Sequence, residues 1–122
     1  MKVSFDFDST LDNQHVQNFA KKLMDDGFNV HIVTGRPTHW SSYEKWDNDD
    51  LYAVAKKLNI KKENIHFNDF KLKKYFFLKN EDFIFHLDDD HIETEEINFF
   101  TKVPAILFDG KWMDNIMKLI NI

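Results

Sequence analysis

The chain opens with KVSFDFDSTLDNQHVQNFAKKLMDDGFNVHIV, residues 2 to 33, and this stretch indicates the fold. KVSFDF alternates between apolar and polar residues in the manner of a short strand. Residues 13 to 27 then place apolar side chains such as Phe19 and Leu23 at helical spacing, with Gly27 as a stop. A second apolar run, FNVHIV, follows at once, so the order is strand, helix, strand.

The rest of the chain continues this alternation. Further strands are expected at 64–67, 82–87 and 103–108, and further helices at 51–58, 68–80, 91–100 and 112–122. Asp69 is the expected N-cap of the helix at 68–80. Strands that alternate with helices predict an α/β fold: a three-layer, Rossmann-like parallel sheet with helices on both faces. With 122 residues, the chain is expected to form a single domain, 1–122.

Composition narrows the classes of protein. Hydrophobic residues make up 43% of the chain, which is enough for a packed core, and the absence of Cys excludes thiol catalysis and thiolate metal sites. The net charge of -5 disfavours nonspecific binding to a polyanion over the whole surface. No apolar run is long enough for a bilayer, so no membrane partner and a cytoplasmic location are expected. The many Phe, Asn, Lys and Ile residues favour an AT-rich genome, that of a phage or a low-GC bacterium, and a phage protein would be expected in the host cytoplasm.

Polar residues follow three of the expected strands at their carboxyl ends. They are Asp6 and Asp8, then Thr34, Gly35 and Arg36, and finally Asp88 and Asp89. Ligands of open parallel sheets bind beyond these ends, so one site can collect all seven residues. Residues two apart in a strand share a face, so Asp6 and Asp8 are expected to crowd one spot. Four clustered carboxylates need a cation, and oxygen ligands without Cys favour Mg²⁺ over zinc.

Three segments resemble motifs of one family, the haloacid dehalogenase-like (HAD) phosphatases. FDFDSTLD resembles the family's first motif, HIVTGRP its second and FIFHLDDD its fourth, and they occur in the family's order. The resemblance spans residues 3 to about 108. It implies a magnesium-dependent phosphomonoesterase that works through an aspartyl-phosphate.

The resemblance also implies roles for individual residues. Asp6 is the expected nucleophile and a Mg²⁺ ligand. Asp8 is the expected general acid and then base, with its backbone carbonyl on the metal. Asp88 is the expected direct Mg²⁺ ligand, and Asp89 is expected either to complete the metal shell or to orient a bound water. Thr34 and the Gly35 backbone N–H are expected to hold the phosphoryl oxygens, a use for which a hydroxyl and a backbone donor are suited.

The family's third motif is a single Lys near the start of a helix. Lys71, Lys73, Lys74 and Lys79 all lie in the right region. Lys73 is the residue we expect in this position, with Lys71 as the runner-up, because a helix capped by Asp69 has Lys73 in its first turns.

Two further features bear on the resemblance. Ser9 stands where the family most often has Gly, and a positive φ there would strain it by about 1 kcal/mol or more. No cap domain fits between the motifs, and capless relatives often act on macromolecular or end-group phosphates. The arrangement loosely resembles the phosphatase part of phage polynucleotide kinases. The expected partner is therefore a phosphorylated small molecule or nucleic-acid end, such as a nucleotide or a 3′ phosphate.

Several alternatives stay open at this stage. The aromatic residues near position 40 can stack on a nucleobase or pack against the body; they are His39, Trp40, Tyr43 and Trp46. Arg36 can grip a second phosphate or pin its loop by a salt bridge. For the whole chain, the alternatives are a binding module that keeps the fold without turnover, or a phosphoacceptor signalling domain, which the order of the motifs disfavours.

Overall fold

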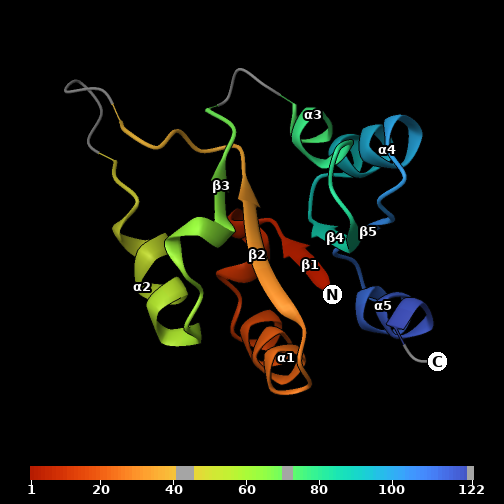
Figure 1. The fold of residues 1–122 in the computed structure, drawn as a ribbon, viewed down its shortest axis with the longest axis horizontal. Helices are drawn as coiled ribbons and strands as arrows, with labels where there is room; N and C mark the ends of the chain where they lie inside the picture. Colours follow the sequence, from red (N-terminus) through yellow and green to blue (C-terminus); the bar gives the residue numbers. More distant parts are fainter. Residues whose placement is uncertain (41–45, 70–72, 121–122) are drawn as a thin grey trace.

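The computed structural model describes residues 1–40, 46–69 and 73–120, which form an α/β fold around a five-stranded, all-parallel sheet (Figure 1). The strands are β1 (Lys2–Phe5), β2 (Asn29–Thr34), β3 (Ile65–Phe67), β4 (Phe83–Asp88) and β5 (Ala105–Leu107). The helices are α1 (Gln14–Asp25), α2 (Asp49–Leu58), α3 (Lys74–Leu78), α4 (His91–Phe100) and α5 (Trp112–Ile120). The predicted fold class is confirmed.

The sheet has the order β3-β2-β1-β4-β5, which creates a switch point at its centre. From β1 the chain builds outward through β2 to β3, and it then returns to place β4 on the other side of β1. In open parallel sheets, the crevice beyond the carboxyl ends of two such strands is where ligands bind. The topology therefore predicts a ligand site beyond the carboxyl ends of β1 and β4.

Helices cover both faces of the sheet. Figure 1 shows α1, α2 and α5 below the sheet and α3 and α4 above it. The first three helices share one apolar cluster with strand residues of the same face, namely Val3, Phe5, Val30, Ile32, Phe85 and Leu87. The other two helices contribute Leu78 and Ile97 to a second, smaller cluster. This is the three-layer arrangement that the alternating pattern predicts.

The sheet face toward α3 carries polar side chains, because successive strand residues point to opposite faces. Ser4 and His86 are fully buried there and hydrogen-bonded to each other. His31 is buried beside His66, whose ring stacks on Phe77 of α3 at 4.4 Å between ring centroids. Buried polar groups are costly without partners, so this face depends on hydrogen-bonded pairs.

Two local expectations are wrong. The first strand ends at Phe5, and Asp6 leads into a tight turn over Phe7–Leu11. The helix expected at 68–80 begins only at Lys74; Asp69 has φ 57° and is not its N-cap, a position that takes an extended backbone.

Within the described parts of the chain, no helix is long and apolar enough to span a membrane.

The His31 and His66 rings meet across β2 and β3, with His31 Nδ1 2.9 Å from His66 Nε2. Burial, together with the charges of His66 and Lys2, lowers the pKa of His31 from 6.5 to about 4, against the opposing effect of Glu81. Burial also lowers the pKa of His66. Both rings are therefore held neutral in the folded protein at neutral pH.

We expect the free energy of unfolding to fall as the pH drops from about 6.5 to about 4. In that window the unfolded chain protonates His31 while the folded chain does not, so protons favour unfolding. His31→Gln should remove part of this pH dependence, whereas His15→Gln, at an exposed position of α1, should not. Urea unfolding at several pH values measures both, and an unchanged pH dependence in His31→Gln would contradict the assignment.

Candidate active site

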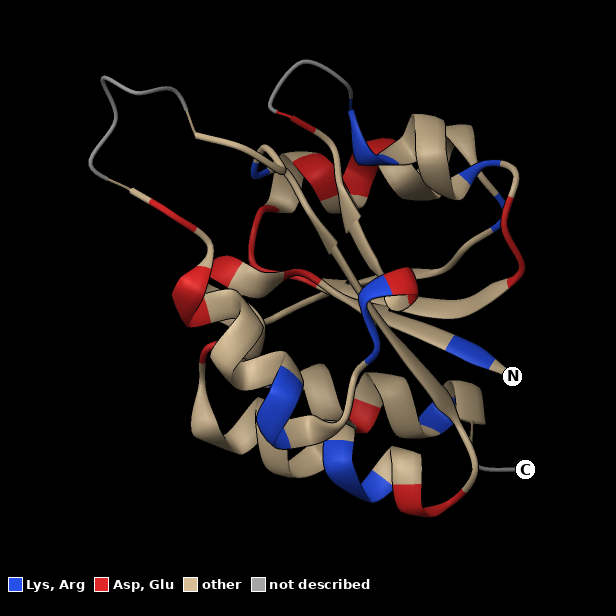
Figure 2. Cartoon of the chain, turned by 60° about the vertical axis from the view of Figure 1, so that its left-hand side comes forward, with Lys and Arg blue, Asp and Glu red and all other residues tan. Residues whose placement is uncertain are grey.

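Asp6 and Asp88 lie together at the switch point because their strands are neighbours. Asp6 follows β1, and its backbone N–H donates to the Leu87 carbonyl at 2.8 Å, one residue before Asp88 ends β4. Both residues are buried. Figure 2 shows acidic segments from several elements gathered around this edge of the sheet. Two carboxylates thus meet in the crevice that the topology creates.

Lys74 reaches between the two carboxylates from the first position of α3. Its Nζ is 2.8 Å from Asp6 Oδ1 and 2.7 Å from Asp88 Oδ2, and the residue is only 5% exposed. The Thr10 hydroxyl donates to Asp6 Oδ2 at 3.3 Å. Charges buried this deeply are tolerated only when they are paired and hydrogen-bonded. The ammonium group is therefore what allows two carboxylates to share this place.

The two carboxylates of this triad, Asp6, Lys74 and Asp88, have pKa values shifted in opposite directions. The pKa of Asp6 is raised to about 8, because burial and the charge of Asp88 raise it by more than the neighbouring Lys74 lowers it. Burial acts in the same direction on Asp88, but the hydrogen bond from His86 and the ion pair with Lys74 outweigh it and hold its pKa below the usual range. One ammonium cannot neutralise two carboxylates, so the site favours a further positive charge.

A third carboxylate, Asp89, makes the site a candidate metal centre. One oxygen from each of Asp6, Asp88 and Asp89 can be chosen so that all three lie within 4.8 Å of one another. Asp89 is exposed, so the group opens toward solvent. Carboxylate oxygens suit a hard divalent cation such as Mg²⁺. The residues present therefore fit such an ion.

A buried hydrogen-bond chain runs from Asp88 through His86 to Ser4. The sequence analysis did not predict it. His86 Nε2 lies 2.8 Å from Asp88 Oδ2, and His86 Nδ1 lies 2.8 Å from Ser4 Oγ. An ionised carboxylate only accepts, so Nε2–H donates to Asp88, Nδ1 accepts, and the Ser4 hydroxyl donates to it. The chain fixes both the tautomer of His86 and the direction of the Asp88 carboxylate. The signal in the sequence was the strand period, which puts His86 and Asp88 on one face.

Ser4, His86 and Asp88 have the residue types of a serine hydrolase triad but do not form one. All three are buried, with exposed fractions of 0%, 0% and 1%, so no substrate reaches the Ser4 hydroxyl. A nucleophile must be able to touch the reacting atom. The role of these hydrogen bonds is to orient the Asp88 carboxylate.

Asp8 belongs to a second, exposed network. Arg36 Nε and Nη2 donate to its two oxygens at 3.0 and 2.7 Å, and Nη1 and Nη2 donate to Asp50 of α2 at 2.7 and 2.9 Å. Hydrogen bonds to Asp50 and Asp8 raise the pKa of Arg36 above its usual range. The prediction that Asp6 and Asp8 crowd one spot is wrong, because β1 ends before Asp6 and the following turn aims Asp8 at Arg36.

The same geometry places Arg36 in a salt bridge that pins its loop, the second of the two uses considered for it. Asp8 accordingly lies outside the group of carboxylates that can share a cation. The guanidinium also lies over the Phe7 ring, 5.0 Å from its centroid. A bidentate guanidinium–carboxylate pair holds both partners in a fixed direction.

Thr34 and Gly35 occupy the carboxyl end of β2, next to β1. The Thr34 hydroxyl accepts a hydrogen bond from the Arg36 backbone N–H at 3.1 Å, and a hydroxyl that accepts can still donate its own proton. A Cβ added at Gly35 would meet no atom within 4 Å, so there is open space beside this backbone. The pair can offer a hydroxyl and a backbone N–H to a ligand.

The lysine that contacts the carboxylates is Lys74, the residue after the expected Lys73. Lys73 precedes α3 with an extended backbone, and its Nζ lies 3.5 Å from Glu96 with the side chain 55% exposed. Lys71 lies outside the described residues. The signal that identifies Lys74 is its spacing from Leu78, because residues four apart share a helix face and Leu78 is fully buried.

Ser9 has φ 59°, so the turn after Asp6 does require the left-handed conformation that the sequence analysis considered. Its backbone N–H donates to Asp12 Oδ2 at 3.2 Å, a contact that supports the turn. The strain of a non-glycine residue in this conformation is of the order of 1 kcal/mol or more.

The aromatic residues near position 40 are partly packed together. Trp40 and Trp46 meet edge to face with ring centroids 5.7 Å apart, and Trp40 Nε1 donates to Asn48 at 3.3 Å. Trp46 is nevertheless 66% exposed. Tyr43 lies outside the described residues, so base stacking in this segment stays a prediction.

Comparison of the chain with known protein families, curated protein sequences and solved structures gives no match.

Replacing Lys74 should be far more damaging than replacing its neighbour. In metal-free buffer, Lys74→Met leaves Asp6 and Asp88 without their cation, and we expect a loss of roughly 3 kcal/mol in the free energy of unfolding. Lys73→Met removes only an exposed ion pair and should cost less than about 1 kcal/mol. Urea unfolding of both variants measures the difference, and equal losses would contradict the role assigned to Lys74.

Proposed function

We propose that the protein is a Mg²⁺-dependent phosphomonoesterase of the HAD type that works through an aspartyl-phosphate on Asp6. The observation that carries this proposal is the buried Asp6–Lys74–Asp88 triad, with Asp89 beside it, at the switch point of the sheet. The order of the three sequence motifs supports the same assignment.

The donors around the triad suit a phosphoryl group. A phosphate ester carries negative charge on several oxygens, and it needs cations and hydrogen-bond donors to approach a carboxylate. Lys74 supplies one cation, and the Thr34 hydroxyl and Gly35 N–H supply donors at the end of the next strand. A divalent cation held by Asp6, Asp88 and Asp89 would neutralise further phosphoryl charge when bound.

The chemistry follows from the two carboxylates that the structure separates. Asp6 attacks phosphorus, so an O–P bond forms on its carboxylate while the bond from phosphorus to the leaving oxygen breaks. Asp8, once released from Arg36 and protonated by solvent, gives its proton to that oxygen. Asp8, now a carboxylate, then takes a proton from water as the water attacks phosphorus, the Asp6–phosphorus bond breaks and inorganic phosphate leaves. Two easier displacements replace one difficult displacement.

In this scheme Arg36 binds the Asp8 carboxylate until a substrate is present. The Asp8 carboxylate is 57% exposed and bound to a guanidinium, so it must exchange this partner for the leaving oxygen when a substrate arrives. Substrates of this open site are nucleotides or the 3′ phosphate of a nucleic-acid end.

One observation favours a second candidate, a phosphate-binding module without turnover. The Asp8 carboxylate is engaged on both oxygens by Arg36, and Arg36 is anchored in turn by Asp50. If that network never opens, the site has no general acid. Asp8 would then serve to fix the loop, and Asp6 would only bind metal and ligand.

Substitution of the two carboxylates tests the chemistry. With Mg²⁺ present, Asp6→Asn should lose phosphate release by at least about a thousandfold, and Asp8→Asn by about a hundredfold or more. The assay measures phosphate released from 5′ and 3′ mononucleotides, 3′-phosphorylated oligonucleotides, sugar phosphates and an aryl phosphate. Asp25→Asn, at an exposed position near the end of α1, is the control. Wild-type rates in Asp6→Asn would exclude the mechanism, and no turnover of any substrate by the wild type would favour the binding module.

Metal binding can be tested apart from turnover. We expect isothermal titration of the EDTA-treated protein to show one Mg²⁺ site that Asp88→Asn and Asp89→Asn each weaken by tenfold or more, because each removes one carboxylate of the group. EDTA should also abolish phosphate release and Mg²⁺ restore it. Unchanged Mg²⁺ affinity in both variants would show that the ion does not use these carboxylates.

A further inference from the structure

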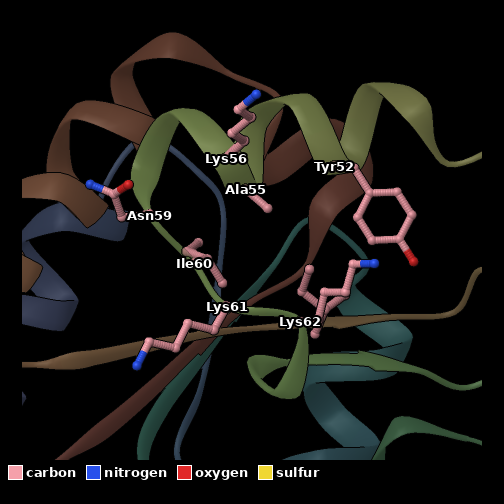
Figure 3. Close-up of a pocket in the computed structure, with 8 residues that line it drawn as sticks. Tyr52, Ala55, Lys56, Asn59, Ile60, Lys61 and Lys62 are labelled. Carbon is pink, nitrogen blue, oxygen red and sulfur yellow. The ribbon is translucent and has the colours of Figure 1, made fainter.

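A pocket of about 670 Å³ lies between α2 and the edge strand β3, apart from the candidate active site. Buried apolar side chains line it, namely Ala55, Ile60 and Ile65. Figure 3 shows Ala55 on α2 and Ile60 on the segment that leads from this helix toward β3. Its volume lies in the range of pockets that bind small molecules.

The charge of this pocket is opposite to that of the whole chain. Lys56, Lys61 and Lys62 line it, and among the residues that the structure describes no Asp or Glu does. None of these three ammonium groups has an ion-pair partner within the described parts of the chain. In a chain of net charge -5, three unpaired cations around an apolar floor are complementary to an anion with an apolar body.

Tyr52 adds a flat, accessible ring to the same pocket. The residue is 36% exposed, and the Lys62 Nζ lies 5.9 Å from its ring centroid. Figure 3 shows the Lys62 side chain directed toward this ring. An aromatic face with a cation at its edge can stack on a planar ring while the cation binds a phosphate attached to that ring.

We propose that this α2–β3 pocket binds a nucleoside phosphate, with the base against Tyr52 and the apolar floor and the phosphate at Lys62 and its neighbouring lysines. The ligand is either a free nucleotide or one nucleotide of a single-stranded nucleic acid. Tyr52 lies two residues after Asp50, which anchors Arg36, so the pocket begins near the rim of the candidate active site. The proposal does not require turnover at Asp6.

Binding is measured by fluorescence anisotropy of a labelled oligothymidylate without a terminal phosphate monoester, in EDTA. These conditions keep the chemistry of Asp6 out of the measurement, so failure here and failure of the phosphatase proposal are distinguishable. Tyr52→Leu should weaken binding about fivefold or more, as loss of one stacked base does. Phe99→Leu is the matched control, because Phe99 is an aromatic residue of α4 with 81% exposure.

Lys62→Gln should weaken binding about threefold and lower the salt dependence of the affinity by roughly one phosphate contact. Lys21→Gln, on an exposed position of α1, should change neither. Displacement of the probe by thymidine monophosphate assigns the site to free nucleotides, and displacement by unlabelled oligothymidylate alone assigns it to a strand. The proposal is overturned if neither thymidine monophosphate nor oligothymidylate binds, or if Tyr52→Leu and Lys62→Gln bind as their control variants do. It is also overturned if a polyglutamate peptide displaces the probe while Tyr52→Leu has no effect.

Discussion

The ion triad of Lys74 with Asp6 and Asp88 is the interaction on which the rest of the structure depends. It joins α3 to the ends of β1 and β4, which are far apart in sequence and adjacent in the sheet. Removal of one partner from such a buried group leaves an uncompensated charge, which proteins tolerate poorly. The same requirement explains why α3 presents a lysine rather than an apolar residue to this face.

The triad is embedded in a sheet face that is polar along much of its length. Ser4 and His86 continue the hydrogen bonds inward from Asp88, and His31 and His66 form a separate pair nearer the edge of the sheet. The opposite face is packed with Val, Ile, Leu and Phe side chains from the strands and three helices. Stability therefore resides mainly on one face, and the other face is available to hold charged groups in defined directions.

The two acidic residues of the first motif have different surroundings and so are suited to different roles. Asp6 is buried beside a lysine, where burial raises its pKa, while Asp8 is exposed and bound to Arg36. Helix α2 links this region to the basic pocket. Its first turn carries Asp50, which anchors Arg36, and its last turn carries Lys56. Opposite charges thus gather at the two ends of one helix, one toward the candidate metal centre and one toward the α2–β3 pocket.

The sequence by itself determined the α/β class, the order of the elements and the strand ends at which Asp6, Thr34 and Asp88 stand. These features depend on local periodicity, which is written into consecutive residues. Only the tertiary structure decided that Lys74 rather than Lys73 reaches the carboxylates and that Asp8 turns to Arg36. Both outcomes depend on where a helix starts and how a turn is aimed, and packing between distant segments sets these, since neighbouring residues on one element point in different directions.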